Sequence, residues 1–189
     1  VELKGLERVC LRAGTRTGDQ LIMFEMAGAE GFELELDMPA SVVAQGRDGE
    51  LALLAGDEWL EEELAGRRLR VSAPSPFPAN TEQAEGVLAT VRDYLQPAGE
   101  EVLLDAGAGV GLFTLALRNA VAGSVAVEEN PWAVADFLHN VGEAGNAGVI
   151  EAPLAEGLAE IEGGIDLAVV SAGINSLGPA VWGEVRRLR

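Results

Sequence analysis

The stretch Glu101-Val-Leu-Leu-Asp-Ala-Gly-Ala-Gly-Val-Gly111 decides the fold of this chain. A short apolar run ends in the acid Asp105, and glycines follow at alternate positions, Gly107, Gly109 and Gly111. Glycines in such a turn let the backbone come close to a ligand, and they expose amide groups at the start of the next helix. The pattern predicts a glycine loop between a strand and a helix of a parallel α/β sheet.

A second acid lies at the end of the next apolar run. Ser124-Val-Ala-Val127 is followed by Glu128, and a carboxylate about 20 residues beyond a glycine loop is placed to accept hydrogen bonds from ribose hydroxyls. We therefore predict that Glu128 binds the ribose of an adenosine-containing cofactor, with an ordinary surface acid as the alternative. Asp105 has a structural alternative, since its carboxylate can anchor amides of the glycine loop.

The chain divides into two regions near residue 75. Residues 1–74 are predicted to form a small β-rich α+β domain, with a short helix over Glu58–Leu64. Its β-type runs are Leu6–Arg12, Gln20–Met26, Gly31–Leu36, Ser41–Gln45, Leu51–Ala55 and Arg68–Ser72. Ala73–Pro78 is predicted to be a linker, because a stretch so rich in proline cannot continue a central strand.

Residues 75–189 show alternating strand and helix patterns. Asn80 and Gln83 form a capping box for a helix over Thr81–Tyr94. Strands are predicted near 101–105, 124–128, 147–151 and 165–171, and helices near 110–120, 131–144, 153–160 and 179–187. This alternation predicts a parallel sheet with right-handed crossovers, so the second domain is expected to be α/β and Rossmann-like.

Composition excludes several kinds of site. The chain has one cysteine, Cys10, and one histidine, His139, so an internal disulfide is excluded and we expect no metal site. His139 falls within a predicted helix, and we expect it to be solvated. No apolar run approaches the roughly 20 residues of a membrane span, and the charged start is not a signal peptide. A cytoplasmic protein without a membrane partner is therefore expected.

The chain is strongly acidic. Thirty-one acids oppose 13 bases, which gives a formal net charge of −18. Such a charge repels nucleic acid, because its binders neutralise phosphates with Lys and Arg. One interpretation is that the protein does not hold RNA unaided, and the plainer one is a compositional bias with a solubilising surface. Arg68 and Arg70 alternate in one strand and are expected on a single solvated face.

The glycine loop and Glu128 together resemble the site of class I S-adenosylmethionine-dependent methyltransferases. A dinucleotide site is the main competitor, but it shows Gly-x-Gly-x-x-Gly, whereas these glycines are evenly spaced. Pro76-Phe-Pro-Ala-Asn-Thr-Glu-Gln-Ala-Glu85 and Val127-Glu-Glu-Asn-Pro-Trp-Ala-Val134 are similar to segments of the RNA uracil-C5 methyltransferases. The resemblance extends from about Leu6 to Gly178, and it implies an S-adenosylmethionine cofactor and an RNA partner.

The resemblance also implies a set of cofactor-binding residues. Phe77 has an alternative as a core residue, although its segment borders the cofactor in the family, and Asn80 is expected to act first as a helix cap. The full set is Phe77, Asn80, Asp105, Gly107, Gly109, Gly111 and Glu128.

The chain departs from this family where the chemistry lies. Methylation of uracil at C5 requires a nucleophile that adds at C6 and a base that removes the C5 proton. In the family a Cys and a Glu of a C-terminal segment do this; the chain stops before such a segment, and Cys10 matches neither. Ser171 and Ile174 stand where the family motif has Asp and Arg. Pro78 replaces a Gln, and Pro153 replaces an acid.

We therefore predict no catalytic residue in this chain and retain two hypotheses. One is a truncated and diverged RNA uracil-C5 methyltransferase homologue that does not methylate uracil by itself. The other is a non-catalytic module on a methyltransferase scaffold, which binds S-adenosylmethionine or a protein partner. In such a partial sheet the strand near 165–171 is an edge. Leu167–Ser171 is thus expected to be capped by the final helix or to pair with another copy in a homodimer.

Overall fold

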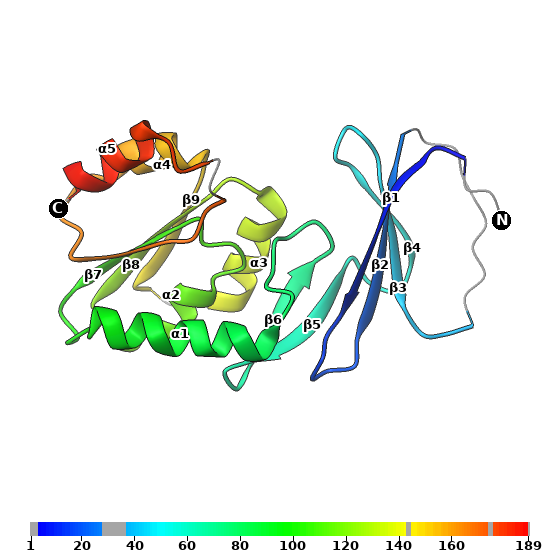
Figure 1. Cartoon of the computed structure of the whole chain (residues 1–189), viewed down its shortest axis with the longest axis horizontal. Coiled ribbons are helices and arrows are strands. Elements are labelled where there is room, and N and C mark those ends of the chain that lie inside the picture. The colour runs from blue at the N-terminus through cyan, green and yellow to red at the C-terminus, as the bar shows by residue number, and fades with distance from the viewer. Residues whose placement is uncertain (1–3, 28–36, 143–144, 174–175, 189) are drawn as a thin grey trace. The chain divides into compact units, whose positions relative to one another are not determined.

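The computed structural model describes residues 4–27, 37–142, 145–173 and 176–188 (Figure 1). The chain forms two compact units, Val1–Ala73 and Pro74–Arg189, which we call the N-terminal unit and the C-terminal unit. Within the described ranges, no helix has the length and apolarity needed to cross a membrane.

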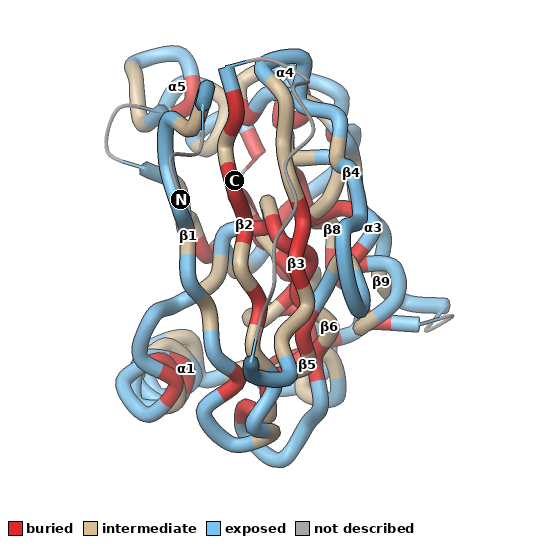
Figure 2. The backbone as a smooth tube through the Cα atoms, turned by 90° about the vertical axis from the view of Figure 1, so that its right-hand side faces the viewer, coloured by how far each residue is buried: buried red, intermediate tan, exposed pale blue. Residues whose placement is uncertain are grey.

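The N-terminal unit contains a four-stranded sheet in the order β1-β2-β3-β4. Its strands are β1 (Leu6–Ala13), β2 (Gln20–Met26), β3 (Ser41–Gln45) and β4 (Leu51–Ala55). β2 and β3 are parallel, and the other neighbours are antiparallel. The buried residues of this sheet lie mainly in β2 and β3, the two central strands, each of which has a neighbouring strand on both sides (Figure 2). The expected strand Gly31–Leu36 lies outside the described residues.

The predicted helix over Glu58–Leu64 is wrong, because this segment is a strand. β5 (Trp59–Leu64) pairs antiparallel with β6 (Arg67–Ser72). Every second residue of β5 is buried, which is the period of a strand and not of a helix. Ala65 and Gly66 join the two strands with φ angles of 52° and 72°, as a tight two-residue hairpin turn requires.

The C-terminal unit is a parallel sheet with helices on both faces, which confirms the predicted α/β class (Figure 1). The strand order is β10-β7-β8-β9, and all neighbours are parallel. The strands are β7 (Val102–Ala106), β8 (Gly123–Glu128), β9 (Ala147–Glu151) and β10 (Leu167–Val170), close to their predicted positions. The alternation of elements was therefore readable from the apolar pattern alone.

Among the described residues of this unit, five helices accompany the sheet: α1 (Thr81–Leu95), α2 (Leu112–Leu117), α3 (Pro131–Val141), α4 (Leu154–Glu160) and α5 (Pro179–Arg187). On one face, Leu103 packs with residues that include Leu95 of α1 and Leu117 of α2. On the other face, Leu104 packs with residues of α4 and α5.

β10 lies at an edge of the sheet, as the partial sheet predicts. The final helix covers one of its faces, since Val181 and Leu188 share a core cluster against which Val170 packs. The amide of Ile165 also donates to the carbonyl of Leu188 at 2.8 Å. The final helix thus covers one face of β10, whereas capping of its free edge and pairing with another copy stay predictions.

Candidate functional site

A cavity of about 760 Å³ opens at the carboxyl ends of the parallel strands in the C-terminal unit. Ligands bind in α/β proteins at this end of the sheet, where the loops converge. The cavity is lined by Pro76, Phe77, Pro78, Ala79, Asn80, Gln83, Ala84, Val87, Leu88, Gly107, Ala108, Gly109, Val110, Leu112, Phe113, Val127, Glu128, Glu129, Ala152, Leu154, Ser171, Ala172, Gly173 and Ser176.

The three glycines of the loop have different tasks. Gly107 has φ +78°, and a Cβ there would lie 2.6 Å from the carbonyl oxygen of Ser171, so only glycine allows the loop to pass the end of β10. Gly109 has φ +55° and lines the cavity. Gly111 does not line it; a Cβ there would lie 2.9 Å from a ring carbon of Phe137. Gly111 thus allows α2 to pack closely on α3.

Glu128 lies beside the glycine loop with its carboxylate held in place. The side chain lines the cavity and is only 7% exposed. Oε2 accepts the amide of Gly109 at 2.8 Å, and Oε1 accepts the amide of Asn130 at 2.9 Å. Each carboxylate oxygen has a second lone pair, so both can still accept a hydroxyl. The geometry is that of a fixed acceptor at the position expected to bind ribose.

Asp105 is not part of the cavity lining. It is fully buried, and its Oδ2 accepts both the amide and the hydroxyl of Thr114, at 2.9 and 2.8 Å. It therefore anchors the first turn of α2, whereas the structural alternative placed its carboxylate on amides of the glycine loop. Burial raises the pKa of Asp105 to about 6; the Thr114 hydrogen bonds oppose this rise, and repulsion from Glu128 adds to it.

The segment before α1 forms another wall of the cavity. Phe77 and Asn80 both line it. Asn80 is also the N-cap of α1, because its Oδ1 accepts the amide of Gln83 at 2.9 Å, which confirms the expected cap. Pro78 and Ser171, two positions that depart from the family pattern, line the cavity as well.

Sequence reasoning missed the polar side chains that hold this wall. The hydroxyl of Ser75 donates to Oδ2 of Asp136 at 2.6 Å, and both residues are fully buried. Nδ2 of Asn130 donates to the carbonyl of Pro74 at 3.0 Å. The Asn-Pro pair at 130–131 is a helix-start signal that could have identified Asn130, whereas nothing local marks Ser75 or Asp136.

Three of the remaining candidates, Pro153, His139 and Arg68, are not among the residues that line the cavity. Pro153 is the residue before α4 and does not line the cavity, and Ile174 lies outside the described residues. His139 is exposed in the last turn of α3, as expected. Arg68 pairs with Glu61 at 2.9 Å in the N-terminal unit.

Arg70 and Cys10 belong to the N-terminal unit. The guanidinium of Arg70 lies 5.5 Å from the ring centre of Trp59, so this side chain stacks within its own unit. Cys10 is half-buried in β1 of the same unit. Among the described residues, no three His, Cys, Asp or Glu side chains gather as a metal site would require.

The cavity and glycine loop invite comparison with known proteins. No family model matches the chain. An uncharacterized RNA methyltransferase of Thermosynechococcus vestitus is 32% identical over 185 residues, which cover 88% of this chain and 41% of that protein. The tRNA (uracil-5-)-methyltransferase homolog A of Homo sapiens is 35% identical over 87 residues, 46% of this chain and 14% of that protein. The chain thus spans less than half the length of these relatives.

Solved structures agree on the fold. The tRNA (uracil-54, C5)-methyltransferase of Pyrococcus abyssi, in complex with S-adenosyl-L-homocysteine, matches 95% of this chain and 46% of its own, with a TM-score of 0.69 and 22% identity. The tRNA m1G37 methyltransferase of M. jannaschii matches 93% of this chain and 56% of its own, with a TM-score of 0.56 and 19% identity. At these identities the matches establish the fold, including the small β-rich part that precedes the parallel sheet.

Proposed function

The chain is a homologue of RNA methyltransferases, and from this relation we propose that its C-terminal unit binds S-adenosylmethionine in the cavity above the parallel sheet. The observation that carries the proposal is the carboxylate of Glu128, which is fixed by the amides of Gly109 and Asn130 at the cavity wall. A fixed carboxylate with free lone pairs is the acceptor that the two ribose hydroxyls of adenosine require.

The charge of the cavity supports this cofactor over a dinucleotide. Among the described residues that line the cavity, Glu128 and Glu129 are the only ones with an ionisable side chain. The phosphates of a dinucleotide would meet these acids with no lysine or arginine among the described lining residues to offset them. S-adenosylmethionine carries a sulfonium cation, which two nearby carboxylates favour.

Bound S-adenosylmethionine would supply an activated methyl group. The chain's own residues bind and orient it: the glycine loop approaches it closely, Glu128 holds the ribose, and Phe77 covers it from the segment before α1. Asn80 is included because it lines the cavity. Asp105 and Gly111 would act indirectly, because Asp105 is bonded to α2 and Gly111 packs against α3.

We further propose that this chain does not methylate uracil by itself. Methylation at C5 requires a nucleophile and a base near the methyl group. Ser171 and Pro78 line the cavity where the related enzymes have Asp and Gln, and Cys10 is not among the described lining residues. The formal charge of −18 also disfavours an RNA partner held by this chain alone.

A second candidate function is a non-catalytic module that binds the cofactor and acts through a protein partner, including a second copy of the chain. The same substitutions at the cavity rim favour it, because they leave the adenosine side of the site intact. Cytoplasmic location is part of both proposals, in keeping with the RNA-modifying relatives and the single cysteine.

Calorimetry tests the proposal directly. We expect S-adenosylmethionine and S-adenosylhomocysteine to bind the wild-type chain and NADH not to bind. Glu128→Gln should weaken binding by about 2 kcal/mol, because it removes a charge-assisted acceptor and leaves an amide group facing another donor. Glu160→Gln, which removes an exposed charge at the end of α4, is the matched control. Absence of binding by the wild type would refute the proposal.

An RNA assay tests the second part of the proposal, that this chain does not methylate uracil by itself. The chain is incubated with radiolabelled S-adenosylmethionine and unmodified RNA that contains uracil. We expect cofactor binding without methyl transfer. Transfer of label to C5 of uracil would show that the chain carries its own nucleophile and would contradict the second part of the proposal.

A further inference from the structure

We propose that α3 is the positioning element of this cofactor site, and that Asn130 and Asp136 hold the segment Pro74–Asn80 against the glycine loop. The inference rests on the proposed function, because it assigns these residues an effect on cofactor affinity. Neither lines the cavity. They are therefore positioning residues that act through the wall segment and through Glu128.

The wall segment depends on outside support. Pro74, Pro76 and Pro78 alternate through it, and proline has no amide hydrogen to donate. The backbone here has few hydrogen bonds of its own to offer, so side chains from elsewhere must fix it. Five successive residues of the segment, Pro76 to Asn80, line the cavity, so a shift of the segment changes the cavity itself.

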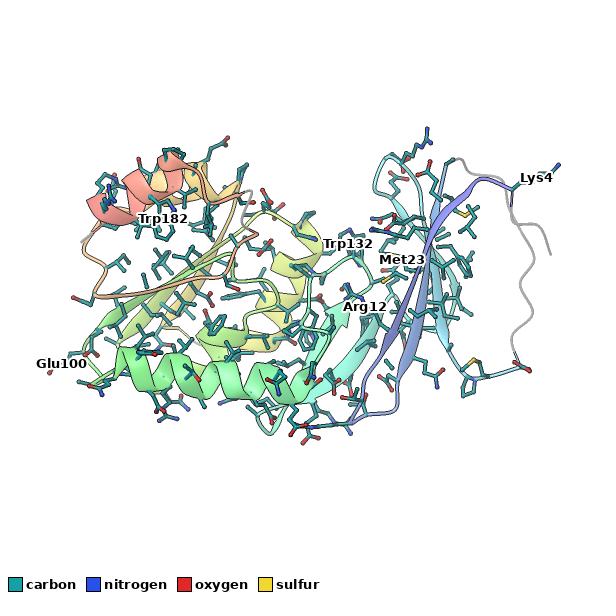
Figure 3. The ribbon with its side chains drawn as sticks, viewed as in Figure 1. Lys4, Arg12, Met23, Glu100, Trp132 and Trp182 are labelled. Atoms are coloured by element: carbon teal, nitrogen blue, oxygen red, sulfur yellow. The ribbon has the colours of Figure 1, made fainter. Side chains whose placement is uncertain are left out.

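Asn130 links the wall to the ribose-binding acid. Its Nδ2 donates to the carbonyl of Pro74 at 3.0 Å, while its amide donates to Oε1 of Glu128 at 2.9 Å. Its Oδ1 accepts the amides of Trp132 (labelled in Figure 3) and Ala133 at 3.0 and 3.3 Å, and so caps α3. Asn130 thereby fixes the wall segment, the carboxylate of Glu128 and the start of α3 relative to one another.

Asp136 supplies the second attachment, further along the same helix. Its Oδ2 accepts the hydroxyl of Ser75 at 2.6 Å, and both side chains are fully buried. A buried carboxylate in a short hydrogen bond is a costly group to retain for packing alone. With Asn130 holding Pro74 and Asp136 holding Ser75, consecutive residues of the wall are tied to one helix.

α3 also holds the glycine loop against which the wall lies. Nδ2 of Asn140 donates to the carbonyl of Val110 at 3.1 Å, and Phe137 packs where a side chain on Gly111 would otherwise stand. The carbonyl oxygen of Pro76 lies 3.7 Å from the position that a Cβ of Gly109 would take, so wall and loop are close neighbours. The glycine loop, Glu128 and the wall thus share α3 as their common support.

Asn130→Asp separates this role from helix stability. Aspartate retains an oxygen that caps α3, but it loses the amide group that holds Pro74. We expect binding of S-adenosylhomocysteine to weaken about tenfold or more. Amide exchange of Phe77 and Ala79 should accelerate, while exchange in β8 stays as in the wild type. Ser75→Ala should weaken binding in the same way, because it removes the other attachment.

Two controls exclude simpler explanations. Val121→Ala truncates a buried core residue that does not line the cavity, and it should lower stability without changing affinity. Adenosine, which is uncharged, tests whether the new carboxylate of Asn130→Asp acts by charge. We expect adenosine and S-adenosylhomocysteine to lose affinity together; a loss confined to S-adenosylhomocysteine, whose amino-acid part carries an ammonium and a carboxylate, would overturn the inference.

The remaining outcomes are distinct. If the wild type does not bind S-adenosylhomocysteine, the proposed function fails and the inference fails with it. If the wild type binds, and Asn130→Asp and Ser75→Ala bind within about twofold of it, the inference alone is overturned. If Val121→Ala weakens binding as much as they do, affinity follows general stability, and the positioning role is refuted.

Discussion

The N-terminal and C-terminal units each bury a carboxylate, Glu62 in β5 and Asp105 in β7. Hydrogen-bond donors contact both oxygens of Glu62 but only one oxygen of Asp105. Glu62 is 2% exposed and accepts hydrogen bonds from the amide and hydroxyl of Thr15 and from the amides of Arg16 and Glu63. Asp105 is 0% exposed and is bonded through Oδ2 to Thr114. Its Oδ1 has no hydrogen-bond partner among the described residues.

The pKa values of the two groups therefore move in opposite directions. Burial acts to raise the pKa of Glu62, but the hydrogen bonds outweigh it, and the pKa lies below its ordinary value of 4.5. For Asp105 burial prevails, and the pKa rises from 3.8 to about 6. The number of donors, and not the depth of burial, decides whether the ionised group stabilises the fold. Strongly shifted pKa values are concentrated at functional sites, and Asp105 lies near the end of the strand that leads into the glycine loop.

The largest expected effect is the loss of the fully bonded carboxylate. Glu62→Gln replaces one acceptor oxygen with an amide group that faces buried donors, and it should reduce the free energy of unfolding of the N-terminal unit by about 4 kcal/mol at neutral pH. Urea unfolding followed by amide exchange in β5 measures this loss. Glu50→Gln removes an exposed charge and should have little effect.

The same variant has a defined pH dependence. Because the pKa of Glu62 is lowered in the fold, its contribution is complete above the ordinary value of 4.5 and is lost as the pH falls through the lowered value. The stability of Glu62→Gln should therefore converge on that of the wild type in acid. A difference that stays constant down to the acid transition would contradict the lowered pKa.

Asp105→Asn should change the free energy of unfolding in the opposite direction from Glu62→Gln at neutral pH. The folded state binds this proton more tightly than the unfolded state, so wild-type stability falls as the pH rises from 3.8 towards about 6, by at most about 3 kcal/mol. Asparagine keeps an oxygen for Thr114 and carries no charge. We expect the variant to gain stability relative to the wild type as the pH rises through this window, as measured by amide exchange in β7 and β8. A variant less stable than the wild type at about pH 8 would show that the ionised carboxylate is well satisfied.

Thr114→Val sharpens the contrast by removing one of the donors to Asp105. Valine has nearly the same shape, so the loss is that of one hydrogen bond to a buried carboxylate, about 1.5 kcal/mol. The pKa of Asp105 should rise further, because burial then acts against fewer hydrogen bonds. A carbon-13 titration of the side-chain carboxyl reports that pKa directly, and an unchanged titration would contradict the assigned cause.

The elements of the C-terminal unit were predictable because its strands and helices follow local apolar periods. β5 was not, because the burial of Glu62 depends on Thr15 and Arg16, which are 47 and 46 residues away in the chain. A glutamate-rich segment favours a helix on local grounds, and the distant donors override that preference. The hairpin turn at Ala65-Gly66 was the local sign of a strand pair.

The candidate site was predictable in outline because the glycine loop and Glu128 form a local sequence motif. Gly107, Gly109 and Gly111 are equivalent in the sequence, but the packing of Ser171 and Phe137 gives them different tasks. Ser75 and Asp136 are 61 residues apart, so no spacing could link them. The motif marks where a ligand approaches the backbone, whereas the supports of the site depend on tertiary contacts.

The smallest expected effect belongs to a carboxylate that is neither buried nor fully bonded. Glu61 is next to Glu62 in β5, but it meets Arg68 at 2.9 Å on the solvated side of the hairpin. Arg68→Ala should cost about 0.5 kcal/mol, and this difference should diminish in high salt, because solvent and ions screen an exposed pair. Urea unfolding at two salt concentrations measures it. A loss as large as that of Glu62→Gln would mean that charge alone, and not the set of donors around a carboxylate, governs stability in this unit.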